Sequence, residues 1–379
     1  MEIKLTRIEI IVFRAPIDIP VRTSFGVMSD RPAVLIRVED DQGAHGWGEV
    51  WCNFPTCGAE HRARLAETVI APLIIGRSFA KPDDGLTWLE EKTGVLAIQT
   101  AEYGPLAQAI AGMDIALWDL AARRSGQPLH KFLGGTGPDA MPAYASGINP
   151  DAPMDTVQSS REAGYRAFKL KIGFNADHDV ANVEEISRSL GEDEHLMVDA
   201  NQAWDLSTAK EMSRKLVKNK LDWLEEPIRA DRPVEEWAEL AAASSIPLAA
   251  GENIRGQDEF QTAIDGGNIR VIQPDACKWG GITGCLAVAR NALTAGRRYC
   301  PHYLGGGIGL LASAHLLATV GGDGLLEVDI NFNPLREGLA QPFPSLKNGN
   351  FMLSDAPGLG VEPDLEEVDR FIVMRREVY

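Results

Sequence analysis

Seven polar side chains recur at nearly constant intervals along the second half of this 379-residue chain. Successive members are 23 to 28 residues apart, and most of them end a short apolar segment such as AFKLK, HLMVD or LDWLE. One strand, one helix and two loops fill about that length, and the active sites of (β/α) barrels lie at the carboxyl ends of the strands. The spacing therefore predicts a barrel that gathers these side chains at one end: Lys171, Asp199, Glu225, Glu252, Asp275, His302 and Glu327.

The segment before the barrel has a different pattern. Apolar residues alternate over 8–12 and again over 34–38, which is typical of antiparallel strands, and apolar residues at steps of three and four over 106–120 indicate a helix that stops near Gly126. Asn348-Gly349 is a hairpin signal in the tail, which we expect to fold back onto the N-terminal domain. The predicted fold is an α/β chain with a (β/α)7β barrel and an α+β capping domain, divided into residues 1–135 (cap), 136–335 (barrel) and 336–379 (tail completing the cap).

Composition excludes several classes of function. A formal net charge of −17 argues against nucleic acid, because phosphate binding relies on clustered Lys and Arg. Five cysteines without a C-x-x-C pair indicate reduced or incidental thiols, and the apolar runs are too short for a signal peptide or a membrane span. We expect a cytoplasmic protein that binds neither nucleic acid nor membrane.

Three successive strand ends carry carboxylates. Asp199, Glu225 and Glu252 would form an oxygen-only site, which suits Mg²⁺, because this ion takes a few carboxylates and completes its shell with water and substrate oxygens. Without a cation three converging carboxylates would repel one another. Any one of them alone is better explained as a surface acid, but the regular spacing of all three favours one Mg²⁺ per active site.

Two kinds of base accompany these acids. Lys169 and Lys171 are two residues apart and therefore share one face of a strand, and a like charge or a nearby Mg²⁺ would lower the pKa of Lys171 toward neutrality. Asp275 and His302 lie on the sixth and seventh predicted strands, which are neighbours in the barrel. A carboxylate there can fix the imidazole tautomer and raise its basicity. The alternatives are exposed lysines and a structural histidine.

Two bases on opposite sides of a metal-bound carboxylate suit removal of the α-proton, because the cation stabilises the enolate. Such an arrangement permits racemisation. It equally permits dehydration, in which one group takes the α-proton and the other protonates a departing β-hydroxyl.

The chain resembles the enolase superfamily, and within it the mandelate racemase and muconate lactonizing enzyme subgroup. The resemblance rests on the helix AIAGMDIALWDLAARRSGQPLHKFLGG (109–135) and on the motifs KLKIG, VDANQAW, LEEP, GEN and PDACKWGG, which together span most of the chain. It implies Asp199, Glu225 and Glu252 as metal ligands, Lys171 as one base and His302 with Asp275 as the other. It also implies that Lys169 orients the substrate carboxylate and that Glu327, kept protonated, donates a hydrogen bond to it.

Further roles follow from the same resemblance. Asn201 and Asn253 fit positions that contact the substrate or the ligands, Lys278 is expected to serve loop structure, and strand alternation would point Glu226 away from the metal. Asp275 departs from the muconate cycloisomerase pattern, which carries a catalytic lysine there. The resemblance further implies a small carboxylate substrate and a homo-oligomer.

Two loops of the cap would select the substrate. They lie near 22–30 and 51–57 and offer Phe25, Trp51 and Asn53, although packing between cap and barrel explains these residues equally well. The glycines of 305–309 could present backbone N–H groups to a substrate oxygen, or form an ordinary tight turn.

These observations favour an Mg²⁺-dependent lyase that dehydrates a hydroxy acid or acid sugar to a 2-keto acid. A racemase or epimerase that uses the same two bases is the alternative. A metal-binding barrel without catalytic activity is a remote third.

Overall fold

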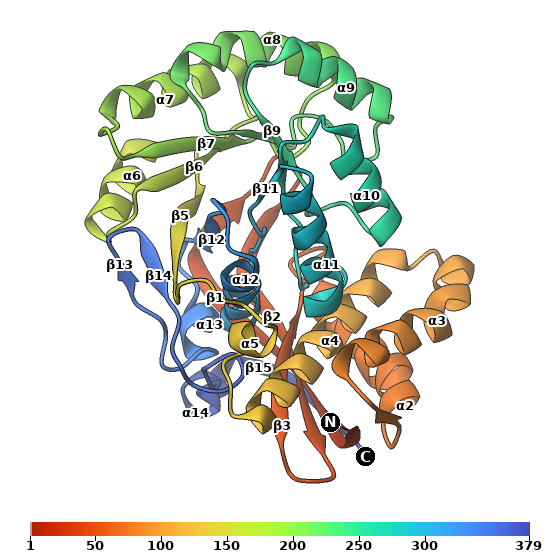
Figure 1. Ribbon diagram of the computed structural model, residues 1–379. Coiled ribbons are helices and arrows are strands. Elements are labelled where there is room, and N and C mark those ends of the chain that lie inside the picture. The colour runs from red at the N-terminus through yellow and green to blue at the C-terminus, as the bar shows by residue number, and fades with distance from the viewer. Residues whose placement is uncertain (1) are drawn as a thin grey trace.

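The computed structural model describes residues 2–379, which form an antiparallel cap sheet and a parallel barrel (Figure 1). In the cap the strands lie in the order β15-β1-β2-β3, and β4 pairs with β1. The strand bounds are Ile3–Arg22 (β1), Val27–Asp40 (β2), His45–Val50 (β3), Ser78–Phe79 (β4) and Ile372–Val378 (β15).

The cap sheet is buried on both faces. Ile10 and Val12 point into a core formed with the cap helices, whereas the alternate residues Ile11 and Phe13 belong to the core of the barrel. The apolar alternation correctly predicts the strands but not this second buried face, because residues of both parities are apolar where the sheet lies between helices and barrel.

The cap helices cover one face of this sheet (Figure 1). The long helix α4 ends at Gly126 with a φ of 70°, so the predicted glycine stop is confirmed. The helix bounds are Gly58–Leu65 (α1), Ala71–Ile74 (α2), Pro82–Thr100 (α3), Tyr103–Ser125 (α4) and Leu129–Phe132 (α5), with a π-helix at Ala66–Ile70 (η1).

Eight parallel strands follow in the order β12-β5-β6-β7-β8-β9-β10-β11. A hydrogen bond of 3.4 Å from Leu325 N to Cys300 Sγ joins the two ends of this order. The bounds are Ala140–Ile148 (β5), Ala167–Lys171 (β6), His195–Asp199 (β7), Leu224–Glu225 (β8), Leu248–Ala250 (β9), Val271–Ile272 (β10), Arg298–Tyr299 (β11) and Leu326–Asp329 (β12).

One helix separates each strand from the next, which confirms the (β/α)7β barrel. These helices form an outer layer around the strands (Figure 1). Their bounds are Pro153–Glu162 (α6), Ala176–Ser189 (α7), Leu206–Leu216 (α8), Val234–Ala243 (α9), Gln257–Gly266 (α10), Gly281–Thr294 (α11) and Gly307–Val320 (α12), with a 3₁₀ turn at Val217–Asn219 (η2).

The tail returns to the cap, as expected, because β15 pairs antiparallel with β1. Asn348 and Gly349 form the hairpin turn with φ values of 49° and 77°, and β14 pairs with the barrel strand β5. The remaining elements are Pro334–Gly338 (α13), Leu346–Lys347 (β13), Asn350–Met352 (β14), Leu365–Val368 (α14) and Asp369–Phe371 (η3).

Two further findings bear on the sequence predictions. Within residues 2–379 no helix has the length and apolarity that crossing a membrane requires. All five cysteines are free thiols, and four of them are buried.

Candidate functional site

A buried apolar layer forms the floor of the barrel interior. Each strand, or a residue directly next to it, contributes one member: Tyr144, Ala167, Met197, Trp223, Ala249, Val271, Cys300 and Leu325. Since side chains alternate along a strand, the residues two positions onward enter the barrel directly above this floor. They include most of the polar residues of the candidate site: Ser146, Lys169, Asp199, Glu225, Gln273, His302 and Glu327.

Lys171 stands at the end of β6 and is held by β7. Its Nζ donates to Asp199 Oδ2 at 2.6 Å and to Asn201 Oδ1 at 2.8 Å. Burial lowers the pKa of Lys171, and Lys169 lowers it further, but Asp199 and Glu225 together outweigh both and the net shift is upward. The expected pKa near neutrality is therefore wrong while Asp199 is the partner of Lys171.

Lys169 is fully buried one layer deeper. Its Nζ lies 2.7 Å from Glu225 Oε1 and 2.7 Å from Glu327 Oε1, and 5.3 Å from the centre of the Tyr144 ring. Burial opposes its charge, but Glu225 and Glu327 together raise the pKa of Lys169 well above its ordinary value. Lys169 is thus the cation that two buried carboxylates share.

Glu252 is held by a lysine that we expected to serve only the loop. Lys278 Nζ donates to Glu252 Oε2 at 2.8 Å and to Asn253 Oδ1 at 2.9 Å, and it lies 4.7 Å from the centre of the Trp51 ring. Both Lys278 and Glu252 are largely buried. Lys278 therefore belongs to the site, and the structural interpretation of it was wrong.

Glu226 also differs from its prediction. Its carboxylate accepts two hydrogen bonds from Asn253 Nδ2, at 3.0 and 2.9 Å, and it is buried. Burial, followed by repulsion from Glu252 and Asp199, raises the pKa of Glu226 well above its ordinary value. Strand alternation does not apply, because β8 ends at Glu225 and Glu226 has a left-handed φ of 39°.

His302 and Asp275 pair as predicted. His302 Nδ1 lies 2.8 Å from Asp275 Oδ2, and its Nε2 lies 3.4 Å from Glu252 Oε2. Burial lowers the pKa of His302, but Glu252, Glu327 and the bond to Asp275 outweigh it and raise the pKa to about 9. The free Nε2 faces the carboxylates, so this imidazole can exchange a proton there.

Glu327 is ionised rather than protonated. It accepts hydrogen bonds from Ser146 Oγ at 2.5 Å and from Tyr303 N at 2.9 Å, in addition to its contact with Lys169. Burial raises its pKa, but Lys169 and His302 outweigh burial and lower the pKa to about 2. The expected hydrogen-bond donor is therefore an acceptor in this arrangement.

The three expected metal ligands lie at adjacent strand ends. Among residues 2–379, no three acidic, histidine or cysteine side chains already surround one point as metal ligands would; each of the three acids instead faces its own lysine. Burial and then repulsion from Asp199 and Glu327 raise the pKa of Glu225 to about 7, although Lys169 lowers it. Buried, mutually repelling carboxylate oxygens are a donor set that fits Mg²⁺.

The predicted cap-loop residues have different surroundings. Phe25 is 63% exposed and packs edge-on against Phe54, with ring centres 5.1 Å apart. Asn53 is buried, and its Nδ2 donates to Leu304 O at 2.7 Å, so this amide joins cap to barrel. Trp51 is half-buried beside Lys278, so it is the cap residue that lies nearest to the acids among the three.

Two N–H groups of the glycine-rich segment after His302 are bound by an acid of the cap. Glu49 of the cap accepts from Gly306 N at 2.5 Å and from Gly309 N at 2.9 Å. Glu49 is separated from these glycines by more than 250 residues, so no local pattern could reveal the contact. The N–H groups of Gly306 and Gly309 are therefore not available to a substrate oxygen.

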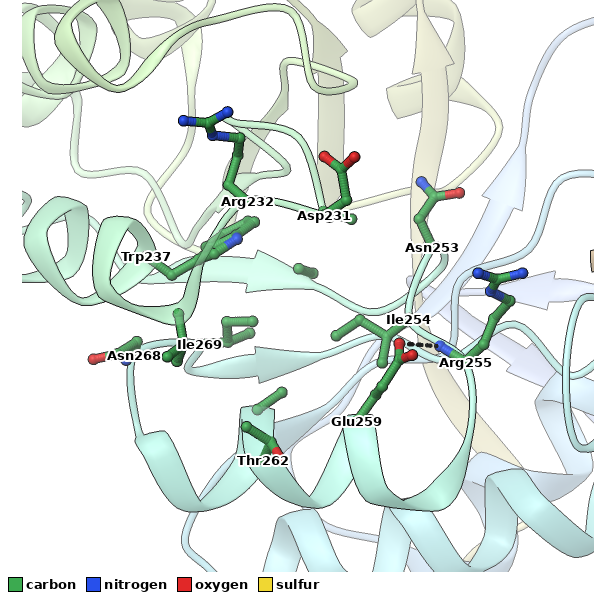
Figure 2. A pocket seen from close by; sticks show the side chains of 14 residues that line it. Asp231, Arg232, Trp237, Asn253, Ile254, Arg255, Glu259, Thr262, Asn268 and Ile269 are labelled. Carbon is green, nitrogen blue, oxygen red and sulfur yellow. Dashed lines mark hydrogen bonds between the residues drawn. The ribbon is translucent and has the colours of Figure 1, made fainter. Parts of the chain in front are cut away.

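A cavity of about 400 Å³ opens beside the site, between α9 and α10 (Figure 2). Its floor is apolar, with Trp237 and Ile269, and Arg255 and Glu259 stand at its edge, joined by a 3.2 Å hydrogen bond from Arg255 N. Of the predicted site residues, only Asn253 lines it. The cavity thus lies outside the barrel, behind the loop that carries Glu252.

Several polar residues of the site were not predicted. Gln273 Nε2 donates to Glu225 Oε2 at 2.8 Å, and Ser146 donates to Glu327. Arg31 of the cap pairs with Asp329 at 2.5 Å, and both are buried. Ser146 and Gln273 lie two residues beyond the floor layer, which is the signal that could have identified them.

Comparison with known proteins agrees with this geometry. Residues 7–134 match the model of the mandelate racemase / muconate lactonizing enzyme N-terminal domain, and residues 154–368 match the enolase C-terminal domain-like model. A solved mandelate racemase/muconate lactonizing enzyme from Bordetella bronchiseptica RB50 is 57% identical, covers 98% of this chain and 99% of its own, and superposes with a TM-score of 0.92.

Characterised relatives are more distant. D-galactarolactone cycloisomerase from Agrobacterium fabrum is 27% identical over 97% of this chain and 98% of its own. D-galactonate dehydratase from Xanthomonas euvesicatoria is 31% identical over 89% of this chain and 90% of its own. The structure of a racemase from Streptomyces coelicolor was solved with bound magnesium. It is 28% identical, covers 97% of this chain and 100% of its own, and superposes with a TM-score of 0.86. This chain therefore belongs to the mandelate racemase and muconate lactonizing enzyme family of the enolase superfamily, and it is a lyase or isomerase.

Proposed function

We propose that this enzyme is a magnesium-dependent dehydratase of acid sugars, which converts a hydroxy acid to a 2-keto acid. The carrying observation is that Lys171 ends β6, whereas Asp275 and His302 lie just beyond β10 and β11, which are not neighbours of β6. Asp199 contacts Lys171, and Glu252 contacts His302. Two chemically different proton carriers suit a reaction that removes a proton and protonates a leaving group.

The metal would be held by Asp199, Glu225 and Glu252, and it would supply positive charge beside the substrate carboxylate. Lys171 and Lys278 occupy Asp199 and Glu252 in the structure, so both ammonium groups would have to share or release these acids when the cation binds. Release from Asp199 removes the contact that raises the pKa of Lys171, which would favour its role as a base.

In the proposed reaction, Lys171 Nζ takes the proton from the carbon next to the carboxylate. His302 Nε2 then gives its proton to the hydroxyl on the following carbon, and the C–O bond breaks to release water. The resulting enol rearranges to the 2-keto acid. Asp275 holds His302 through Nδ1 at 2.8 Å, so that Nε2 is the nitrogen that faces the substrate.

Other residues would bind and orient the substrate. Lys169, with its partner Glu327, would provide fixed charge for the carboxylate end, and Asn201 would position Lys171. Asn253 would align Glu226 and Lys278 behind the metal. Phe25, Trp51 and Asn53 belong to the cap loops, and Trp51, which lies beside Lys278, would contact the substrate.

Racemisation or epimerisation by the same two bases is the second candidate. It is favoured by the same placement of Lys171 and His302, since a proton removed by one base can be returned by the other. The named relatives include dehydratases, cycloisomerases and a racemase, so they support the shared proton abstraction and both outcomes.

The protein is incubated in D₂O with about 5 mM Mg²⁺, a concentration chosen to saturate the metal site. Galactarate, L-talarate, D-galactonate and arabinonate are each tested as substrate. NMR follows deuterium at C2, and a carbonyl reagent detects 2-keto acid. Keto acid formation supports the dehydratase, whereas deuterium without keto acid supports the racemase. Activity that survives in both Lys171→Ala and His302→Asn, or in excess chelator, would refute the proposed chemistry.

A further inference from the structure

Two buried acids of the cap lie at the N-termini of two barrel helices. Glu49 of β3 is 2% exposed and accepts from Gly306 N and Gly309 N, where α12 begins. Asp114 of α4 is 1% exposed and accepts from Thr283 N at 2.9 Å and from Thr283 Oγ1 at 2.7 Å, where α11 begins. Unpaired N–H groups and the helix dipole make such an end attractive to a carboxylate.

The fit around both acids is close. A Cβ placed on Gly306 would lie 2.7 Å from Glu49 Oε1, and one placed on Gly281 would lie 2.3 Å from Asp114 Oδ2. Because both acids are buried, water cannot replace them at the helix ends. The two contacts therefore fix the distance between the cap and these helices.

Both helices directly follow a residue of the Asp275–His302 pair. The α12 contact lies four residues beyond His302, and the intervening Tyr303 N donates to Glu327 Oε2. The α11 contact lies eight residues beyond Asp275, whose Oδ1 accepts from Cys277 N at 2.8 Å. Each cap acid thus holds one of the two short segments from which the pair projects.

The Lys171 side of the barrel is held differently. The loop after Lys171 is fixed by Asp179 of α7, a barrel residue that accepts from Gly173 N at 2.9 Å. The cap reaches this side through a neutral contact, in which Ser24 Oγ of a half-buried loop donates to Asn201 O at 2.8 Å. Buried charge from the cap therefore reaches the segments of His302 and Asp275 but not the loop of Lys171.

We propose that Glu49 and Asp114 are positioning residues, through which the cap sets the geometry of the Asp275–His302 pair while leaving Lys171 to the barrel. The effect of this coupling on the reaction rests on the proposed function. The coupling itself is a property of the protein alone and can be measured without any substrate.

The test compares Glu49→Gln and Asp114→Asn with a matched control, Asp119→Asn. Asp119 is also a fully buried cap acid that accepts from two backbone N–H groups, Trp47 N at 2.8 Å and Leu359 N at 2.7 Å, but these belong to the cap and the tail. All variants are labelled with ¹⁵N-histidine, and NMR measures solvent exchange of the His302 Nδ1 proton, with thermal unfolding as a check on folding.

We expect this proton to exchange at least about tenfold faster in Glu49→Gln and Asp114→Asn, which is the effect of losing one buried hydrogen bond, and at the wild-type rate in Asp119→Asn. Exchange unchanged in both test variants, or accelerated equally in the control, would overturn the proposal. If a test variant does not fold, Gly306→Ala, which displaces the Glu49 carboxylate, is expected to give the same acceleration.

A kinetic measurement separates this inference from the proposed function. With galactarate and Mg²⁺ in D₂O, Glu49→Gln is expected to slow the proton transfer that depends on His302 by about 10²-fold, the effect of misplacing a group by about 1 Å, and to leave exchange through Lys171 unchanged. Equal loss in both steps would refute a specific positioning role. A wild-type protein that is inactive on galactarate, L-talarate, D-galactonate and arabinonate but gives the expected NMR result would refute the proposed function and retain the coupling.

Discussion

Replacing Lys169 with methionine tests how much of the stability depends on one buried cation. Its Nζ lies 2.7 Å from both Glu225 and Glu327, and all three side chains are buried. Methionine fills similar volume without charge, so the two carboxylates would remain buried without their shared partner. Breaking a buried pair in this way costs about 3–5 kcal/mol.

The pKa of Glu327 reflects Lys169 and His302 together. Lys169 and His302 lower that pKa to about 2 against burial, compared with about 4.3 for a free glutamate. Since one pKa unit corresponds to about 1.4 kcal/mol, the shift is worth about 3 kcal/mol. This stabilisation is fully present above about pH 4.3 and is lost as the pH falls through 2.

The loss in Lys169→Met should also depend on pH. Without the ammonium, the pKa values of Glu225 and Glu327 rise, and a raised carboxyl pKa gives stability that disappears as the pH rises through it. The deficit relative to wild type is therefore expected to grow from pH 5 to pH 8. Urea unfolding in the presence of chelator, followed by tryptophan fluorescence, measures the free energy of unfolding at each pH.

Two comparisons make this prediction specific. Lys210→Met removes a lysine from a surface pair with Glu239, so its cost should stay within about 1 kcal/mol. Lys169→Met combined with Glu327→Gln should recover part of the loss, because one buried charge no longer lacks a partner. A deficit below about 1 kcal/mol, or one that is equal at pH 5 and pH 8, would show that the charge of Lys169 does not stabilise the fold.

Three further predictions concern other groups. Lys171→Ala and His302→Asn should each lower turnover of a confirmed substrate by about 10²- to 10⁴-fold, measured by steady-state kinetics; full activity in both would contradict their roles. Glu252→Gln should weaken Mg²⁺ binding measured by calorimetry, and an unchanged affinity would remove Glu252 from the ligands. His315 is buried beside His130, and burial lowers its pKa to about 3, so stability is lost as the pH falls from about 6.5 toward 3. His315→Gln should reduce this acid sensitivity in unfolding measured from pH 7 to pH 4, and equal slopes would refute the assignment.

The sequence predicts the main chemistry of the barrel because strand parity is a local property. Lys171 follows a short apolar segment and His302 fits the regular spacing, and their side chains point where alternation places them. The same rule does not apply to Glu226, because β8 has only two residues and the backbone turns to a positive φ immediately after it. Very short strands leave the direction of the next side chain to the loop.

Contacts between distant segments could not be predicted in the same way. Glu49 meets Gly306, and Lys278 meets Trp51, only because the cap folds onto the barrel. The ionisation of Glu327 likewise depends on Lys169, a residue on another strand, and not on its own neighbours in the sequence. Pattern and motif therefore identify which residues gather, whereas the folded chain determines which partner each one has.

The apolar floor explains why so few charges suffice to organise this site. Seven of the eight floor residues are followed two positions later by a polar residue, and the eighth, Ala249, is followed by Gly251. Lys169 Nζ lies 5.3 Å from the centre of the Tyr144 ring, and Trp223 Nε1 donates to Glu225. Water is excluded beneath the charges, and electrostatic interactions in such a region are stronger than in water. A floor of this kind fixes the lower ends of the charged side chains and leaves only their upper surface open to a cation and a substrate. The barrel thereby determines the side from which a substrate can approach. In our proposal, the cap sets the distance between the His302 segment and that substrate.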